Sequence, residues 1–358
     1  MWCWARRRSP LRPPPPPSPR RAPSRWPRVP DFPWRPGSAT GVGSLPGADI
    51  AEAQRIVFGE LPELPHLAEL PARGPGADMI GRSAGFLVEL PVQLYAGRWQ
   101  VAPRPGKDLR VTADLLERDL DQLTEQGEKY TGPLKIQSAG PWTLAASIDL
   151  QLGGRLLRDA GAVRDLTDSL AEGLRRHVED VRKRLPRAEI LLQLDEPSLP
   201  TVLAGRVPTE SGLGAYRAVP GPDAATALRT VVEAVGVPVI AHCCAPDVPL
   251  QVFRDARAAA VALDLSLLKD LDPLGEMLEA GLGLFAGAAP TTPPAGGIDG
   301  KKVADRVSTL WKRLAFSPAL LPRQVVITPA CGLAGVSPSY ARAALTACRE
   351  AGRRLSEV

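Results

Sequence analysis

Short apolar runs alternate with amphipathic stretches from residue 134 to the end of the chain. The amphipathic stretch 162–185 is the clearest helix, because its apolar residues recur at spacings of three and four until Pro186 ends it. Such alternation predicts an α/β fold whose parallel strands are joined by right-handed crossovers. Strands are expected at 134–138, 189–194, 239–244, 258–266, 282–286 and 325–328, and the other helices at 223–235, 272–280, 301–314 and 338–355.

The part of the chain before residue 134 has room for further units of the same kind. Helices are expected at 48–60 and 111–127, whereas the Pro-rich stretch 61–105 has no clear period. Eight strand–helix units in about 320 residues suit a (β/α)8 TIM barrel. A doubly wound open sheet is the alternative. No Gly-x-Gly-x-x-Gly sequence or phosphate loop follows a strand, which disfavours the nucleotide-binding version of that alternative.

The first 37 residues differ in composition from the rest. Residues 1–40 carry nine Arg and a single acid, Asp31, and Pro13 to Pro17 form an unbroken run. Proline fixes the backbone and removes hydrogen-bond donors, so we expect residues 1–37 to be a disordered extension and residues 38–358 to be the catalytic barrel domain.

Net charge and hydropathy exclude two classes of partner. Outside residues 1–40 the chain has 35 basic and 38 acidic residues, a net charge of −3, so the domain itself offers no electrostatic argument for nucleic acid. No apolar run approaches the roughly 20 residues of a membrane span.

The five cysteines, at 3, 243, 244, 331 and 348, form no disulfide framework. They indicate a reducing cytoplasm and thiols used for metal binding or packing.

The reactive side chains lie at or just past the carboxyl ends of apolar runs. In a barrel these ends converge on the face that carries catalysis. Side chains two apart in a strand point the same way, so His242 and Cys244 should share one face and Cys243 the other. This pair is half of a zinc site, although a buried strand with packed thiols is the alternative. The residues at strand ends are Ser44, Asp195, His242, Cys244, Asp264 and Cys331.

Four short motifs occur in an order that points to a known family. They are Gly43-Ser44-x-Pro46, Asp195-Glu196-Pro197, His242-x-Cys244 and Pro329-x-Cys331-Gly332-Leu333. With these motifs the chain resembles the catalytic C-terminal barrel of the cobalamin-independent methionine synthases, in a core-only form that covers residues 38–358. The wider superfamily includes the uroporphyrinogen decarboxylases, which share the barrel and lack this zinc set.

The resemblance implies a set of site residues. Zinc would be held by His242, Cys244 and Cys331, with Asp264 at the place of the family's fourth ligand, a Glu. The homocysteine carboxylate would meet Val42, Gly43 and Ser44, and its ammonium group would meet Asp195, the catalytic candidate. Glu196 would support the substrate site.

Two departures from the family concern the methyl donor. Ser147 stands where the family has a Trp against the folate ring, and Trp142 nearby is the substrate-binding candidate in its place. Gly287-Ala288-Ala289-Pro290 stands where the family has a proton-donating His. The donor is therefore left open between a methyltetrahydrofolate, its polyglutamate and a methylated corrinoid protein.

The resemblance implies a zinc-dependent, cytoplasmic methyltransferase that moves a methyl group to the thiol of homocysteine and forms methionine. Two alternatives stay open. One is a decarboxylase-like barrel acting on a tetrapyrrole, which should need a cluster of Arg that the strand ends lack. The other is a non-catalytic protein that binds zinc or homocysteine.

Overall fold

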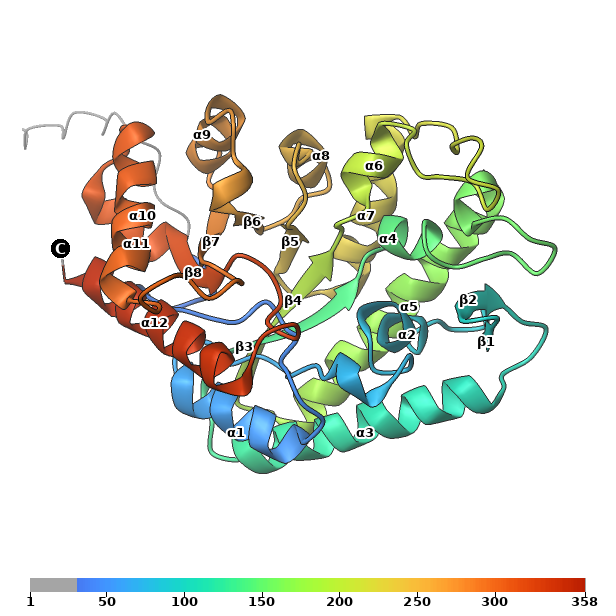
Figure 1. Cartoon of the computed structure of the whole chain (residues 1–358), viewed down its shortest axis with the longest axis horizontal. Coiled ribbons are helices and arrows are strands. Elements are labelled where there is room, and N and C mark those ends of the chain that lie inside the picture. The colour runs from blue at the N-terminus through green and yellow to red at the C-terminus, as the bar shows by residue number, and fades with distance from the viewer. Residues whose placement is uncertain (1–30, 358) are drawn as a thin grey trace, which may run out of the picture. The chain divides into compact units, whose positions relative to one another are not determined.

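A curled parallel sheet organises the molecule (Figure 1). The computed structural model describes residues 31–357. The six strands follow one another in chain order from β3 to β8, and each hydrogen-bonds to the next in parallel. They are β3 (Gly132–Ala139), β4 (Ala188–Asp195), β5 (Val239–Cys243), β6 (Ala260–Asp264), β7 (Gly283–Ala289) and β8 (Val325–Pro329).

Helices connect these strands and pack on the outer side of the curl (Figure 1). The longer ones are α1 (Ile50–Glu60), α3 (Lys107–Gly127), α5 (Ala160–Arg184), α7 (Gly221–Val235), α9 (Asp272–Glu279), α10 (Gly300–Arg313) and α12 (Pro338–Ser356). The shorter ones are α2 (Met79–Ala84), α4 (Pro141–Ala145), α6 (Leu199–Leu203), α8 (Leu250–Asp255) and α11 (Leu321–Gln324), with 3-10 turns η1 (Pro71–Arg73), η2 (Leu156–Arg158), η3 (Leu265–Leu267) and η4 (Pro318–Leu320). The predicted helices from residue 48 onward are all present, with ends that differ by a few residues.

Two irregular segments, residues 38–45 and residues 65–69, lie between β8 and β3. In the first, the Thr40 N–H donates to the Ile327 carbonyl of β8 at 3.0 Å. In the second, the Lys135 N–H of β3 donates to the Pro65 carbonyl at 3.0 Å. A parallel bridge between Ser44 and Glu69 joins the two segments. This arrangement is consistent with a TIM-like barrel, although segments 38–45 and 65–69 form isolated bridges and are not regular strands.

The stretch 61–105, which the sequence left without elements, also contains an antiparallel hairpin. Its strands are β1 (Val92–Tyr95) and β2 (Arg98–Val101), and they form a separate two-stranded sheet. The turn between them places Ala96 and Gly97 at positive φ, which is typical of a two-residue hairpin connection.

The inner side of the curled sheet carries a small apolar cluster of its own. Alternation along each strand puts these side chains on the face opposite the helices. Towards the carboxyl ends the same face becomes polar, so that Leu191 is followed by Gln193 and Asp195, and Ile240 by His242. The apolar cluster consists of Trp34, Leu64, Leu191, Ile240, Ala260, Ala262, Phe285 and Val326.

Trp34 corrects the predicted start of the folded domain. The sequence assigned residues 1–37 to a disordered extension, but the Trp34 indole is only 6% exposed and donates from Nε1 to the Arg323 carbonyl at 3.1 Å. It stacks on Phe32 and meets Phe285 edge to face. A large apolar side chain overrides the prolines around it because its burial is favourable. The rest of the predicted extension, residues 1–30, lies outside the described residues.

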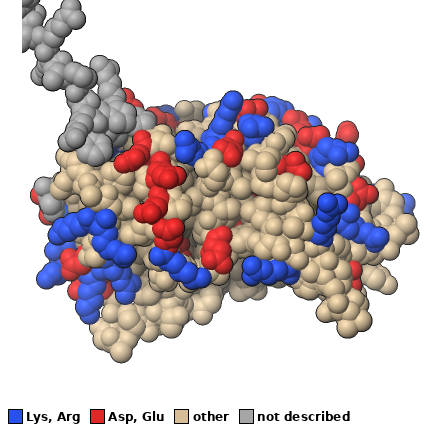
Figure 2. All heavy atoms as spheres, turned by 90° about the horizontal axis from the view of Figure 1, so that it is seen from above, with Lys and Arg blue, Asp and Glu red and all other residues tan. Residues whose placement is uncertain are grey.

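Two surface observations complete the fold. No helix among residues 31–357 is long and apolar enough to cross a membrane. On the face that Figure 2 shows, acidic and basic side chains are both widely distributed.

Candidate metal centre

His242, Cys244 and Cys331 converge at the carboxyl ends of β5 and β8. Their candidate ligand atoms all lie within 4.8 Å of one another, and the two sulfur atoms are 3.0 Å apart. Cys331 lies two residues after the end of β8, whereas His242 lies in β5 and Cys244 comes just after it. The sequence therefore predicted this convergence correctly from two motifs that are 87 residues apart.

Strand alternation separates the two adjacent cysteines. The Cys243 side chain is fully buried in the outer apolar core, while Cys244 is partly exposed beside Cys331. Burial raises the pKa of the Cys243 thiol to about 12, so it stays protonated and inert. Among the cysteines of residues 31–357, Cys244 and Cys331 are therefore the two that offer sulfur to a metal ion.

The donor set fits a soft divalent metal such as zinc. The His242 ring is 3% exposed, and its Nδ1 atom is buried with no hydrogen-bond partner among the described residues. An unpaired buried ring nitrogen beside two thiols is the chemistry of a zinc ligand set. The hydrogen bond with Cys244 and the nearby His242 imidazole lower the pKa of Cys331. The same hydrogen bond and burial raise the pKa of Cys244. Of the two thiols, Cys331 is therefore the one whose thiolate form is favoured.

Asp264 is engaged in a local turn. Its Oδ1 atom accepts from the Ser266 N–H at 2.8 Å and from the Ser266 hydroxyl at 2.6 Å, which caps η3. Its carboxylate is not part of the three-residue group. Its role as a fourth ligand remains a prediction.

Asp195 ends β4 next to the metal group. It pairs in register with His242 on β5 and is 6% exposed. Its Oδ1 atom accepts from the Gln193 amide at 2.7 Å. Burial raises the pKa of Asp195, and the nearby His242 and Lys135 oppose that rise. A buried carboxylate with a single side-chain hydrogen bond would be stabilised by a cationic group beside it.

The loop that contains Val42, Gly43 and Ser44 lies over this carboxylate and against the Cys331 loop. The Val42 carbonyl accepts from Lys135 Nζ at 2.8 Å and from the Gln193 amide at 2.9 Å. The Ser44 carbonyl accepts from the Leu333 N–H at 2.9 Å. A Cβ atom at Gly332 would lie 2.1 Å from the Ser44 hydroxyl, so a larger residue there would displace that hydroxyl. These contacts place the predicted amino-acid loop beside the candidate metal ligands.

Glu196 points away from Asp195 and has a structural role. It is fully buried and accepts from the N–H groups of Trp142 and Thr143 and from the Thr143 hydroxyl, at 2.7–2.9 Å. It thereby caps the start of α4, where an anion is favoured. Burial raises its pKa to about 7. The supporting role expected for Glu196 is consistent with these contacts.

Trp142 is held in place by packing and by a hydrogen bond, and it also lines a cavity. Its side chain is 4% exposed, and Nε1 donates to the Ala224 carbonyl of α7 at 3.0 Å. The sequence predicted that this ring would bind substrate. That role remains a prediction: the ring packs beside α7, and Trp142 is also among the residues that line a cavity of about 760 Å³.

The sequence reasoning missed two buried charged residues. Glu69, which bridges to Ser44, is 7% exposed, and burial raises its pKa to about 7. Lys135 is fully buried in β3, and burial lowers its pKa to about 8, against the attraction of Asp195 and Glu69. The alternation Leu134-Lys135-Ile136-Gln137 could have identified an inward-facing lysine. Nothing marked Glu69, since its segment has no period.

A parallel α/β sheet with imidazole and thiol ligands at its carboxyl ends defines a class of candidate metalloenzymes. Comparison with known families is more specific. The model of the cobalamin-independent synthase catalytic domain matches residues 134–354, more than half of the chain. The chain belongs to this family, which confirms the resemblance seen in its motifs.

Solved structures agree on the fold. A B12-independent methionine synthase from Shewanella sp. W3-18-1, in complex with selenomethionine, is similar with a TM-score of 0.56 at 12% identity, covering 90% of this chain and 98% of that one. A morphinone reductase variant in complex with tetrahydroNAD matches at a TM-score of 0.38 and 12% identity, over 81% of each chain, and supports no argument. The comparison with curated proteins finds no match.

Proposed function

We propose that the protein is a zinc-dependent methyltransferase that methylates the thiol of homocysteine and forms methionine. The observation that carries this proposal is the convergence of one imidazole and two thiols beside a buried carboxylate, in a chain of the cobalamin-independent synthase family. Three protein ligands leave one coordination position for a substrate atom, which is typical of catalytic zinc.

The metal would be held by His242, Cys244 and Cys331. Bound there, zinc would lower the pKa of a substrate thiol and keep it a nucleophile at neutral pH. The remaining chemistry belongs to the protein's own side chains, which have to fix the substrate sulfur and exclude water around it.

Two buried carboxylates would recognise the amino-acid end of homocysteine. Burial raises the pKa of both carboxyl groups, and the charge of Asp195 raises the pKa of Glu69 further, so a cation beside them would be favourable. The ammonium group supplies that cation. The carboxylate would meet the Ser44 hydroxyl and the backbone of Val42 and Gly43. Lys135 holds this loop through the Val42 carbonyl and offsets the charge of the two acids.

The methyl transfer itself needs alignment more than acid–base chemistry. A sulfur–carbon bond forms, the bond between the methyl group and its donor breaks, and the electron pair stays with the donor. The thiol proton is lost before the attack. Anchoring homocysteine at the metal and at Asp195 would fix the direction of its sulfur relative to the donor's methyl group. This lowers the entropic cost of reaching the reactive geometry. The donor is a methyltetrahydrofolate-type molecule or a methylated corrinoid protein.

We also propose that the fold is a complete (β/α)8 barrel. Segments 38–45 and 65–69 would take the places of the first two strands, because their bridges run from β8 through both segments to β3. Closure of this kind would bring the Val42–Ser44 loop to the same mouth as the metal ligands.

Methionine formation tests the proposal. Purified protein loaded with zinc is given homocysteine and a methyl donor, and methionine is measured by mass spectrometry. Cys331→Ser should abolish product. Cys348→Ser is the matched control, because Cys348 is fully buried in α12 outside the group, and it should retain activity. Equal activity in both variants would refute a role for the metal group.

A further inference from the structure

A cavity of about 650 Å³ opens beside the candidate metal centre, between the ends of β6, β7 and β8 and helix α10. Asp264, Gly287 and Ala330 form part of its floor, and Ala330 directly precedes Cys331. We call this cavity the α10 pocket. The α10 pocket therefore adjoins the metal group on the side of β6 to β8. Asp195, Lys135 and the Val42–Ser44 loop adjoin the metal group on the side of β3 and β4.

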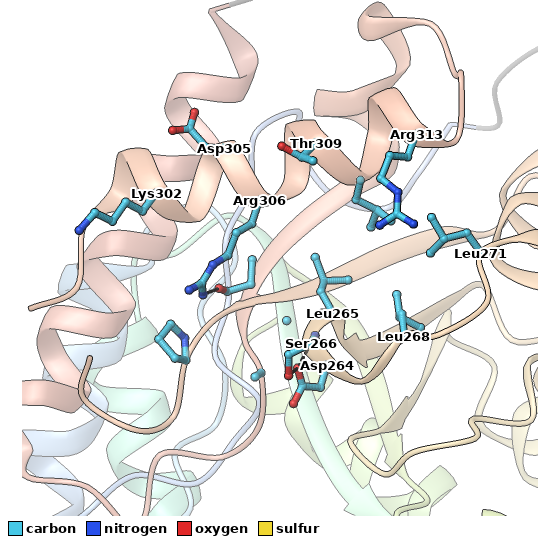
Figure 3. Close-up of a pocket in the computed structure, with 15 residues that line it drawn as sticks. Asp264, Leu265, Ser266, Leu268, Leu271, Lys302, Asp305, Arg306, Thr309 and Arg313 are labelled. Carbon is cyan, nitrogen blue, oxygen red and sulfur yellow. Dashed lines mark hydrogen bonds between the residues drawn. The ribbon is translucent and has the colours of Figure 1, made fainter. Parts of the chain in front are cut away.

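The α10 pocket has one apolar and one basic wall. Leu265, Leu268 and Leu271 line it from the segment that follows β6, and all three are only partly buried. Arg306 and Arg313 enter from α10 on the other side. In Figure 3 the Arg313 side chain extends from the helix toward the segment that carries Leu265, whereas the Arg306 guanidinium group is turned away from that segment.

The cations of this pocket are not neutralised by the protein. Lys302, Arg306 and Arg313 line it with two acids, Asp264 and Asp305, which leaves a net charge of +1. Asp264 already accepts two hydrogen bonds from Ser266. Among residues 31–357 none of the three cations has an ion-pair partner, whereas some other arginines, such as Arg175 with Glu172, are paired.

One of the arginines is also fixed in place. Arg306 Nη1 donates to the Ala288 carbonyl at 2.8 Å, at the end of β7. This bond uses one of five donors and leaves the rest of the planar fork available. Such a fork matches carboxylate and phosphate oxygens in a bidentate manner.

The geometry points to the α10 pocket as the binding site for an anionic small molecule with an apolar body, namely the methyl donor of the proposed reaction. This inference rests on the proposed function. The apolar body would lie on Leu265, Leu268 and Leu271, and carboxylate or phosphate groups would meet Arg306 and Arg313. Homocysteine and donor would then approach the metal group from different sides, which allows the sulfur and the donor's leaving atom to lie on opposite sides of the methyl carbon.

Direct binding tests the inference without turnover. The probes are 5-methyltetrahydropteroyltriglutamate, its monoglutamate and inorganic pyrophosphate, each titrated by calorimetry into zinc-loaded protein without homocysteine. The triglutamate should bind the unaltered protein. Arg306→Ala with Arg313→Ala should weaken it at least tenfold, and added salt should weaken it as well. Lys312→Ala, an exposed cation of α10 that does not line the pocket, should leave the affinity unchanged.

A competition experiment identifies the chemical group that is recognised, and a second variant controls for misfolding. Competition by pyrophosphate would identify phosphate as the group recognised, and its absence would identify carboxylate. Arg313→Glu alone keeps the Arg306–Ala288 bond and should also weaken binding at least tenfold. No binding by the unaltered protein, or equal affinity in all variants, would overturn the inference. If methionine forms but the arginine variants bind the triglutamate with unchanged affinity, this inference fails and the proposed function stands. If the arginine variants bind the triglutamate more weakly but no methionine forms, this inference stands and the proposed function fails.

Discussion

At the scale of single residues, side-chain direction decides which cysteine can bind metal. Cys243 and Cys244 are neighbours, yet one is in the apolar core and the other faces Cys331. The sequence could predict this because a strand has a period of two. It could not predict the role of Glu69, since that role is set by tertiary neighbours that no local pattern encodes.

Zinc content should therefore distinguish the adjacent cysteines. We expect Cys243→Ser to keep one zinc per chain, because its side chain faces away from the site. The unpartnered hydroxyl should still cost about 1–3 kcal/mol of stability. Cys244→Ser should lose most of the metal. Mass spectrometry of metals in purified protein measures both. Equal zinc loss in the two variants would mean that the β5 register described above is wrong.

Glu69 should make ligand binding depend on pH. Its pKa is raised to about 7 by burial, and only the ionised form attracts an ammonium group. Methionine carries that group without a thiol, so it isolates this effect from metal chemistry. Its dissociation constant should rise by about tenfold per pH unit as the pH falls below 7. Calorimetric titrations between pH 6 and pH 8 measure it. Glu69→Gln should flatten the profile, and an unchanged profile in that variant would exclude Glu69.

At the scale of elements, a buried ion network joins α2 and α3 to the site. Asp119 of α3 accepts a bidentate pair of bonds from Arg73 at 2.7 and 2.9 Å and a further bond from Arg82 of α2. Arg82 Nε lies 3.4 Å from Glu69. All of these groups are at most 10% exposed at the side chain. The network thus supports the segment that carries Glu69, which has no regular strand of its own.

Removing Asp119 should be strongly destabilising. Asp119→Ala would leave Arg73 and Arg82 charged, buried and without their shared partner, at a cost of about 3–5 kcal/mol. Urea denaturation measures the change. Glu172→Ala is the control, because Glu172 pairs with two arginines at the surface and should cost less than about 1 kcal/mol. Similar losses in the two variants would show that burial does not govern these pairs.

The elements differ in how well the sequence predicted them. Helix α5 was expected at 162–185 and spans Ala160–Arg184, because its apolar face repeats over many turns. The strands from β3 onward were also found. Segments 38–45 and 65–69 lack that signal, since their pairing partners are distant: Ile327 for the first and Lys135 for the second. Their structure depends on the completed sheet and cannot be predicted from local periodicity.

At the scale of the whole molecule, the inner apolar cluster supports the site from below. Trp34 closes this cluster against Phe285 and leaves no room for a side chain at Gly283, where a Cβ atom would lie 2.5 Å from the indole. The polar residues of the site continue along the same inner face. A stable inner cluster is therefore a condition for the geometry of Asp195 and His242.

Loss of the indole should lower the stability of the whole domain. We expect Trp34→Ala to cost about 3–5 kcal/mol, because a large buried ring is replaced by a void. A chain that begins at Pro36 should show a similar loss relative to one that begins at Pro30. Thermal unfolding followed by circular dichroism measures both comparisons. Equal melting temperatures would restore the boundary at residue 37 that composition suggested.

The most direct measurement of the central claim is X-ray absorption at the zinc edge, with and without homocysteine. Three protein ligands at rest supply two sulfur atoms and one nitrogen, from Cys244, Cys331 and His242. Saturating homocysteine should add one sulfur neighbour to the zinc, with loss of an oxygen or nitrogen neighbour. Asp195→Asn should require far more homocysteine for the same change while zinc content stays constant. A zinc shell that does not change at saturating homocysteine would contradict the account.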